Sequence, residues 1–296
     1  MSPRQIFITA LAVTLLFGIS ACTRSGSAPT PGLASPTGTV APPTATSEPM
    51  AALVNGEGIS VAEFEAEVAR YRAAQSELGL EVTLEQASQT VLDDLINQTL
   101  LAQAAYAAGF KVEEAALQAR IASLESQIGG PEKLLAWQTA HGYTPETFQA
   151  ALKRALAAAW MRDQIAASVP EAVEQVHVRQ ILVYREEKAR DILAQLEAGQ
   201  DFDTLAARYD PITQGDLGWF PRGYLFEPEI EKVVFALEPG QVSGMIATQV
   251  GFHILKVLER DPQHRLSPEA RLVLQDLALQ EWLKKQREQS TILLAP

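Results

Sequence analysis

Apolar residues recur every three or four positions through residues 51–170, which is the period of an amphipathic helix. A short apolar strand and a turn at 55–58 come first, and Ser60 and Glu63 then have the spacing of a capping box. The pattern predicts five helices: one after Ser60, one over about 84–108, one ending at Gly129-Gly130, a short one from Pro131, and one from Pro145 to about Ala167. The apolar stripes behind this prediction are Phe64, Val68 and Tyr71; Val91, Leu92, Leu95, Ile96 and Leu100; Leu117, Ile121, Leu124 and Ile128; and Phe148, Leu152 and Leu156.

From about residue 171 the pattern changes to strands mixed with short helices. Strands are predicted at about 176–184, 241–247 and 251–259, with helical stripes at 189–196, 202–209 and 230–237 between them. The segment "GDLGWFPRG", residues 215–223, is rich in turn formers. This order predicts a small α+β domain with an antiparallel sheet.

A long helix is predicted after Ser267-Pro268, with Leu272, Leu279, Trp282 and Leu283 apolar. An isolated amphipathic helix is marginal in water, so we expect it to pack back on the N-terminal helices.

Two polar side chains fall on strand faces that should be buried. In "VHVRQILV", residues 176–183, a period of two places Gln180 on the face of Val176 and Val178. In "GFHILKV", residues 251–257, the same period places His253 among apolar neighbours. A buried polar group needs partners, so each is more often a satisfied core residue than a functional one. Two of them in one small domain point to a site.

Composition and charge limit the function classes. The chain has 296 residues, 47% hydrophobic and 20% charged, which is enough for two folded domains. The formal net charge of −12 argues against nucleic-acid binding, which needs clustered Lys and Arg.

The N-terminus has the features of a targeting segment. Residues 6–19 are apolar but too short for a comfortable membrane span, and they lead to "GISAC" and Cys22, the single cysteine of the chain. Residues 23–50 are dominated by Pro, Thr, Ser, Gly and Ala, which predicts an extended tether. The tetrapeptide "ISAC" resembles a bacterial lipobox, which implies cleavage before Cys22 and a lipid on its sulfur; an ordinary signal peptide with a chance cysteine is the alternative.

Five ordered blocks over about 175–260 resemble the parvulin-type peptidyl-prolyl isomerases: "RQILV", "LEAGQDFDTLAARY", "GDLGWFPRG", "PEIEKVVFALEPGQVS" and "TQVGFHILKV". The segments "LVNGEGISVAEF" and "LDDLINQTLLAQAAYAAG" resemble the helical chaperone portions of secreted foldases of the SurA and PrsA kind. The resemblance implies an α+β protein: an N-terminal helical module completed by the C-terminal helix, plus an FKBP-like parvulin domain with a four-stranded antiparallel sheet. The expected division is 1–21 signal peptide, 22–50 anchored cysteine and tether, 51–170 helical module, 171–262 isomerase domain and 263–296 C-terminal helix.

The same resemblance implies a site. The catalytic positions correspond to His253, Thr248, Gln180 and Asp210, and the apolar proline pocket to Leu217, Phe220, Leu225 and Ile230. Ordinary core packing is the alternative role for the four apolar residues. Twisting an X-Pro bond requires no metal or cofactor, and none is expected.

Two features depart from the family pattern. Gln180 stands where the family usually has a histidine; its amide can donate and accept at once but cannot take a positive charge. The loop before Gly215 is short, which makes Asp210 the nearest polar candidate there. His177 is expected on the opposite face of its strand.

The sequence therefore predicts a lipid-anchored, extracytoplasmic isomerase and folding chaperone for unfolded or nascent secreted chains with X-Pro bonds. A homodimer is left open. Gln180 and the short loop motivate one alternative, a holdase chaperone whose parvulin domain is catalytically silent. A lipoprotein that captures a small ligand is a second alternative, although two similar α/β lobes are not evident.

Overall fold

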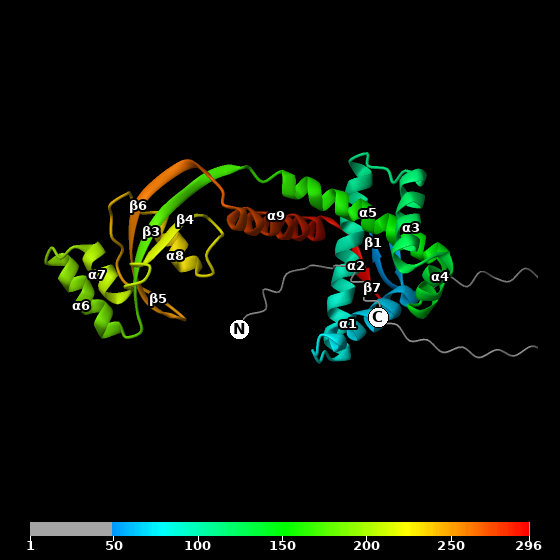
Figure 1. The fold of residues 1–296 in the computed structure, drawn as a ribbon, viewed down its shortest axis with the longest axis horizontal. Helices are drawn as coiled ribbons and strands as arrows, with labels where there is room; N and C mark the ends of the chain where they lie inside the picture. Colours follow the sequence, from blue (N-terminus) through cyan, green and yellow to red (C-terminus); the bar gives the residue numbers. More distant parts are fainter. Residues whose placement is uncertain (1–48, 296) are drawn as a thin grey trace, which may run out of the picture. The chain divides into compact units, whose positions relative to one another are not determined.

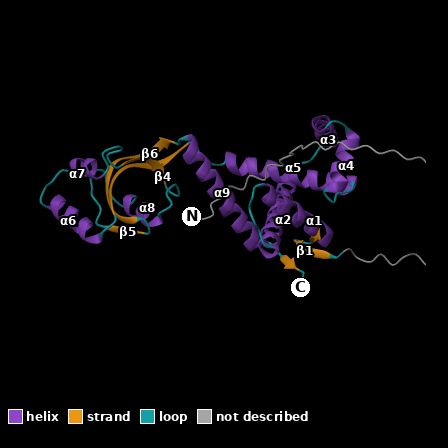
Figure 2. Cartoon of the chain, turned by 60° about the horizontal axis from the view of Figure 1, so that its bottom comes forward, coloured by secondary structure: helices purple, strands orange, loops and turns teal. Residues whose placement is uncertain are grey.

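The computed structural model describes residues 49–295, and the predictions that concern residues 1–48, including Cys22, lie outside them. Contacts divide the described chain into two compact units, one of residues 113–149 and one of residues 50–112 with 150–295. Figures 1 and 2 show the elements, and each unit is described by itself. No helix within the described range is both long and apolar enough to cross a membrane.

The second unit begins with a β-hairpin of β1 (Met50–Val54) and β2 (Glu57–Ser60). Asn55 and Gly56 both have positive φ, 52° and 87°, which suits a two-residue turn. Helix α1 (Val61–Glu77) follows, and its N-cap Ser60 accepts a hydrogen bond from the backbone N–H of Glu63 at 3.1 Å. Helix α2 (Leu84–Ala107) starts with a complete capping box. Buried residues of α2 pack with Val54, Ile59 and Val68 into one core.

The first unit contains α3 (Glu114–Ile128), α4 (Pro131–Ala140) and the start of α5 (Pro145–Ala167). Helix α3 stops because Gly129 adopts the left-handed conformation, with φ of 96°. Trp137 stacks on His141 at 4.1 Å and meets Phe148 edge-on at 6.2 Å. His141 is the C-cap residue of α4.

The elements of residues 172–265 are β3 (Ala172–Val183), α6 (Glu186–Glu197), α7 (Phe202–Tyr209), β4 (Asp216–Pro221), α8 (Pro228–Val234), β5 (Ile246–Thr248) and β6 (Gly251–Arg265). The four strands form an antiparallel sheet in the order β4-β3-β6-β5. Figure 1 shows the sheet curving around α8, with α6 and α7 on its other face. Each face of the sheet packs against its own apolar core. Val176 and Val178 pack beneath α8, whereas Ile181 and Val183 pack beneath α6 and α7. The strand alternation predicted from the sequence is confirmed.

Helix α9 (Pro268–Gln289) packs on α2 and α5 through Leu279, Trp282 and Leu283. The Arg287 guanidinium also donates to the Asn97 side chain at 2.8 Å and to the Asp93 carboxylate at 3.0 Å. These contacts confirm that the C-terminal helix completes the helical module, and the α+β fold class is confirmed with it.

Several details of the sequence prediction were wrong. Residues 216–221 form β4 rather than only a turn, because this segment pairs with β3. Strand β5 is shorter than predicted and β6 runs six residues further, to Arg265. Leu272 is 67% exposed instead of packed. A short strand, β7 (Ile292–Leu294), was not predicted, and it pairs with β1.

Candidate active site

His253 lies on β6 between two neighbouring strands. It is opposite Leu182 of β3 and Ile246 of β5, and its side chain is only 3% exposed. Leu255 and Val257, two and four positions further along β6, belong to the core beneath α8. The strand period therefore places the His253 imidazole at the margin of that apolar core.

Both ring nitrogens of His253 have a partner. Nδ1 lies 3.1 Å from the amide oxygen of Gln180, and Nε2 lies 2.9 Å from the hydroxyl of Thr248. An amide oxygen only accepts, so Nδ1 carries the proton and donates to it. Nε2 then accepts from the Thr248 hydroxyl. The structure thus brings three predicted site residues into one hydrogen-bonded line.

The register of the sheet explains why Gln180 meets His253. Gln180 is directly opposite Leu255 in the antiparallel pair of β3 and β6. His253 is two residues from Leu255 on the same strand, so it is the diagonal neighbour of Gln180 on the same face. Long side chains reach across such a diagonal. Gln180 is half-buried, and this contact gives its amide oxygen a partner.

Burial lowers the pKa of the His253 imidazole below its ordinary value, and the negative charge of Glu227 opposes that shift. The imidazole is therefore neutral at neutral pH, which is the protonation state that the two hydrogen bonds require. Gln180 is neutral as well. The site holds a polar but uncharged pair beside an apolar surface.

The four residues predicted to form a proline pocket share one apolar cluster with Val176, Val178, Leu255 and Val257: they are Leu217, Phe220, Leu225 and Ile230. Phe220 and Ile230 are buried, at 0% and 3% exposed, and they act as core in this structure. Leu217 and Leu225 are half-buried and can present surface to a ligand. The carboxylate of Glu231 accepts hydrogen bonds from the backbone N–H groups of Gly223 and Leu225, both at 2.7 Å, and so fixes the segment that carries Leu225.

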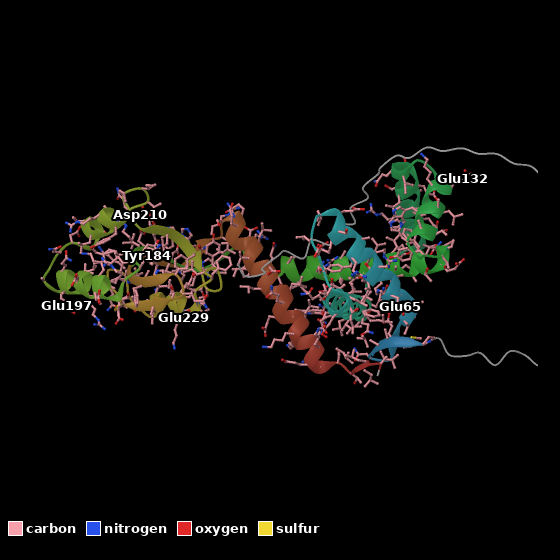
Figure 3. The ribbon with its side chains drawn as sticks, turned by 90° about the horizontal axis from the view of Figure 1, so that it is seen from below. Glu65, Glu132, Tyr184, Glu197, Asp210 and Glu229 are labelled. Atoms are coloured by element: carbon pink, nitrogen blue, oxygen red, sulfur yellow. The ribbon has the colours of Figure 1, made fainter. Side chains whose placement is uncertain are left out.

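Asp210 makes no hydrogen bond with Gln180 or His253 among the described contacts. It lies at the C-terminal end of α7 (Figure 3), and its carboxylate accepts hydrogen bonds from the loop that follows. His177 lies on the other face of β3, as expected, and its Nε2 is 2.8 Å from the Asp216 carboxylate. Arg222 covers the ring of Phe235 at 4.1 Å and lies 3.6 Å from Glu174.

Sequence reasoning missed the residues that support the site. Glu231 and Thr213 gave no recognisable pattern, although Thr213 lies three positions after Asp210, a spacing at which Asp commonly binds local backbone. Gly215 was placed in a turn, but its close approach to β3 was not predicted. Within residues 49–295 no group of three or more His, Cys, Asp or Glu side chains is placed to hold a metal ion.

Comparisons with known proteins agree with this architecture. Residues 173–259 match the family described as "PPIC-type PPIASE domain", and residues 40–154 match the "SurA-like N-terminal domain". The foldase protein PrsA of Halalkalibacterium halodurans is 27% identical over 269 residues, which cover 83% of this chain and 79% of the relative. The chaperone SurA of Methylobacillus flagellatus is 34% identical over 146 residues, 42% of this chain and 33% of that chaperone. A crystal structure of the peptidylprolyl isomerase PrsA from Bacillus cereus aligns with a TM-score of 0.45 and 21% identity, over 79% of this chain and 87% of that one.

Proposed function

We propose that this chain, which belongs to the PrsA- and SurA-like foldases through its PPIC-type PPIase domain and its SurA-like N-terminal domain, isomerises X-Pro bonds with His253, Gln180 and Thr248. The observation that carries the proposal is the line Gln180–His253–Thr248, in which a buried imidazole is held between two half-buried side chains beside an apolar cluster. No charged group takes part in the line. The reaction it fits is a rotation rather than a bond cleavage.

Rotation about an amide bond is opposed by resonance, with a barrier of ~18–20 kcal/mol. Twisting breaks the resonance, so the twisted amide is less polar than the planar one. Apolar surroundings therefore favour the twisted state relative to the planar state. Leu217 and Leu225 are the half-buried members of the cluster, and they would contact the proline ring.

The hydrogen-bonded line would hold the polar groups of the site in fixed positions during this rotation. Donors and acceptors that are already oriented need no reorganisation as the peptide twists. Thr248 is oriented in turn, because its oxygen accepts from the backbone N–H of Val250 at 3.2 Å. Gln180 supplies an acceptor for His253, which is the role its position requires.

The test is cis-trans exchange of a short X-Pro peptide series, measured by NMR with the whole chain. The wild type should accelerate exchange, and His253→Ala should lose most of that acceleration. His177→Ala is the matched control, because it removes an imidazole from the opposite face of the same sheet.

A wild type that does not accelerate exchange would refute the isomerase role. If Gln180→His then accelerates exchange, the protein is a holdase whose isomerase domain is inactive because of Gln180. If neither protein accelerates exchange, the defect lies in the short loop before Gly215.

A chaperone role in the helical module has its own support. Leu78, Leu80 and Leu84 are 72%, 48% and 60% exposed, and they lie in a stretch of seven residues. Beside them, Phe64, Val68 and Leu84 line a cavity of about 320 Å³ between α1 and α2. Exposed apolar side chains beside a cavity are typical of a surface that binds apolar segments.

The test is suppression of the aggregation of an unfolded client protein. This suppression should weaken when Leu78, Leu80 and Leu84 are all changed to Ser. Leu272→Ser changes an equally exposed leucine of α9 and should leave the suppression unchanged.

The proposed location is the outer side of the cytoplasmic membrane, with a lipid on Cys22. The support is the apolar run at 6–19, the small residues before Cys22 and the Pro-rich segment after it. Wild-type protein should be found in the membrane fraction with an acylated N-terminal cysteine. Cys22→Ser should leave that fraction, and its retention there would contradict the anchor.

A further inference from the structure

The loop between α7 and β4 closes on a single carboxylate. Asp210 Oδ1 accepts from the backbone N–H groups of Ile212 and Thr213, both at 3.1 Å. Its Oδ2 accepts from the backbone N–H of Gly215 at 3.4 Å and from the Thr213 hydroxyl. The backbone C=O of Asp210 accepts from Gln214 at 2.9 Å. The loop 210–215 is therefore organised around one side chain.

These contacts keep Asp210 ionised. The Thr213 hydroxyl and the backbone N–H of Thr213 are the main causes that lower the pKa of its carboxyl. Within residues 49–295, every hydrogen bond to this carboxylate comes from the loop itself. The carboxylate is thus engaged in closing the loop, not in meeting a peptide.

The far end of the loop is fixed to Gln180. The C=O of Gly215 accepts from the backbone N–H of Gln180 at 2.8 Å. The two backbones are so close that a Cβ built on Gly215 would lie 1.9 Å from the Gln180 carbonyl oxygen. A continuous set of contacts therefore joins the Asp210 carboxylate to the Gln180 backbone.

The Gln180 side chain depends on that backbone position. Its amide oxygen lies 3.1 Å from His253 Nδ1, near the limit of a good hydrogen bond, so a shift of the backbone breaks the contact. His253 then loses the acceptor that keeps its proton on Nδ1. The Thr248 hydroxyl has a second acceptor, the C=O of Gly251 at 3.3 Å, so Nε2 can take the proton and donate to Thr248 instead.

We propose that Asp210 and Thr213 form a clamp that positions Gln180 and thereby sets the tautomer of His253. Asp210 is a positioning residue in this scheme, not a catalytic one. The proposal rests on the isomerase function proposed above for the same site. It assigns a role to Thr213 and to the loop that neither the resemblance nor the comparisons supply.

The variant that tests the clamp is Thr213→Val, which removes the hydroxyl donor and keeps the shape; Thr213→Ser restores the donor. The matched control is Thr204→Val, because Thr204 makes the same kind of contacts with Asp201, both at 2.8 Å, at the other end of α7. The readouts are kcat and KM from peptide exchange by NMR, and the ¹⁵N shifts of His253, which report its tautomer.

Thr213→Val should lower kcat about tenfold with KM little changed, because a misplaced group loses orientation while the apolar pocket stays. Its ¹⁵N shifts should show the Nε2–H form of His253 rising. Thr213→Ser and Thr204→Val should retain both wild-type kcat and the Nδ1–H form. Asp210→Asn should resemble Thr213→Val, since an amide NH₂ then faces the donors of the loop.

The clamp is overturned if Thr213→Val leaves kcat and the His253 tautomer as in wild type. It is also overturned if kcat falls equally in Thr213→Val and Thr213→Ser while the tautomer stays fixed, which would mark a merely structural role. The tautomer is measurable without turnover. A wild type that is inactive would refute the proposed function, whereas the tautomer comparison would still decide the clamp.

Discussion

Replacing Gly215 by Ala tests how tightly the loop approaches β3. The residue has φ of +73°, where an L side chain is strained by roughly 1–2 kcal/mol. The new Cβ would lie 1.9 Å from the Gln180 carbonyl oxygen, and real Cβ contacts essentially never fall below 3.0 Å, so about 1.1 Å of movement is needed. The neighbour is backbone of a central strand, held by both β4 and β6, so it cannot turn aside.

The movement would weaken the 2.8 Å hydrogen bond from Gln180 N–H to Gly215 C=O, which contributes about 1 kcal/mol. Overpacking at a site that cannot relax costs a further ~1–3 kcal/mol. Added to the strain, these contributions give an expected loss of stability of about 3–6 kcal/mol for the domain. Gly218→Ala is the control, because Gly218 has nearly the same φ, +70°, and nothing within 4 Å of its Cβ position. Gly218→Ala should lose only the stability that the backbone strain costs, roughly 1–2 kcal/mol.

Native-state hydrogen exchange of the β3 amides in increasing urea measures this local stability directly. The isomerase rate should fall in Gly215→Ala and hold in Gly218→Ala. Equal losses of protection in the two variants would refute the reasoning, because the strain alone would then account for both.

Three further predictions concern charge. Burial, with the charge of Asp93, raises the pKa of Asp94 to about 6, so its ionised form destabilises the fold at pH 7 and this cost is relieved as pH falls toward 4. Asp94→Asn should add ~1–2 kcal/mol to the unfolding free energy at pH 7, after allowance for solvent screening, and nothing at pH 4; an equal gain at both pH values in thermal melts would contradict this. Because the pKa of His253 is lowered in the folded state, the unfolded chain takes up this proton at a higher pH than the folded chain does. The free energy of unfolding of the isomerase domain, measured with urea, should therefore decline as pH drops below about 6.5. His253→Gln should make this decline shallower. Arg287→Met should loosen α9 by ~1–2 kcal/mol, seen as faster hydrogen exchange of that helix, whereas Leu272→Ser, a solvent-exposed site on α9, should not.

The sequence predicted the helices well because their determinants are local. Caps such as Ser60 and stops such as Gly129 act within one turn, and the apolar period of 3.6 is visible without the fold. Strand β4 was taken for a turn because Gly and Pro are turn formers; it is a strand because β3 provides a partner for it. Strand β7 has three residues and depends on β1, some 240 positions earlier, so nothing local marks it.

The candidate site likewise has one part that the sequence predicted and one part that it did not. The pairing of Gln180 with His253 was predictable, because two strands of known period on one sheet bring like faces together. The loop contacts of the Asp210 carboxylate were not predicted from residue type or position. Its four acceptor contacts arise from how the loop folds back, and that path is set by the Gly215 contact with β3.

Gln180→Glu examines whether the neutral pair matters. The wild-type imidazole donates from Nδ1 to an uncharged amide, and burial lowers the pKa of His253. A carboxylate at the same distance would favour the imidazolium and raise that pKa. The imidazolium carries a proton on both nitrogens, so Thr248 could no longer donate to Nε2. An NMR titration should show this rise in Gln180→Glu, no rise in Gln180→Met, and an isomerase rate that falls with acidification only in the Glu variant. A His253 pKa that stays below its ordinary value in Gln180→Glu would mean that residue 180 does not contact the imidazole in solution.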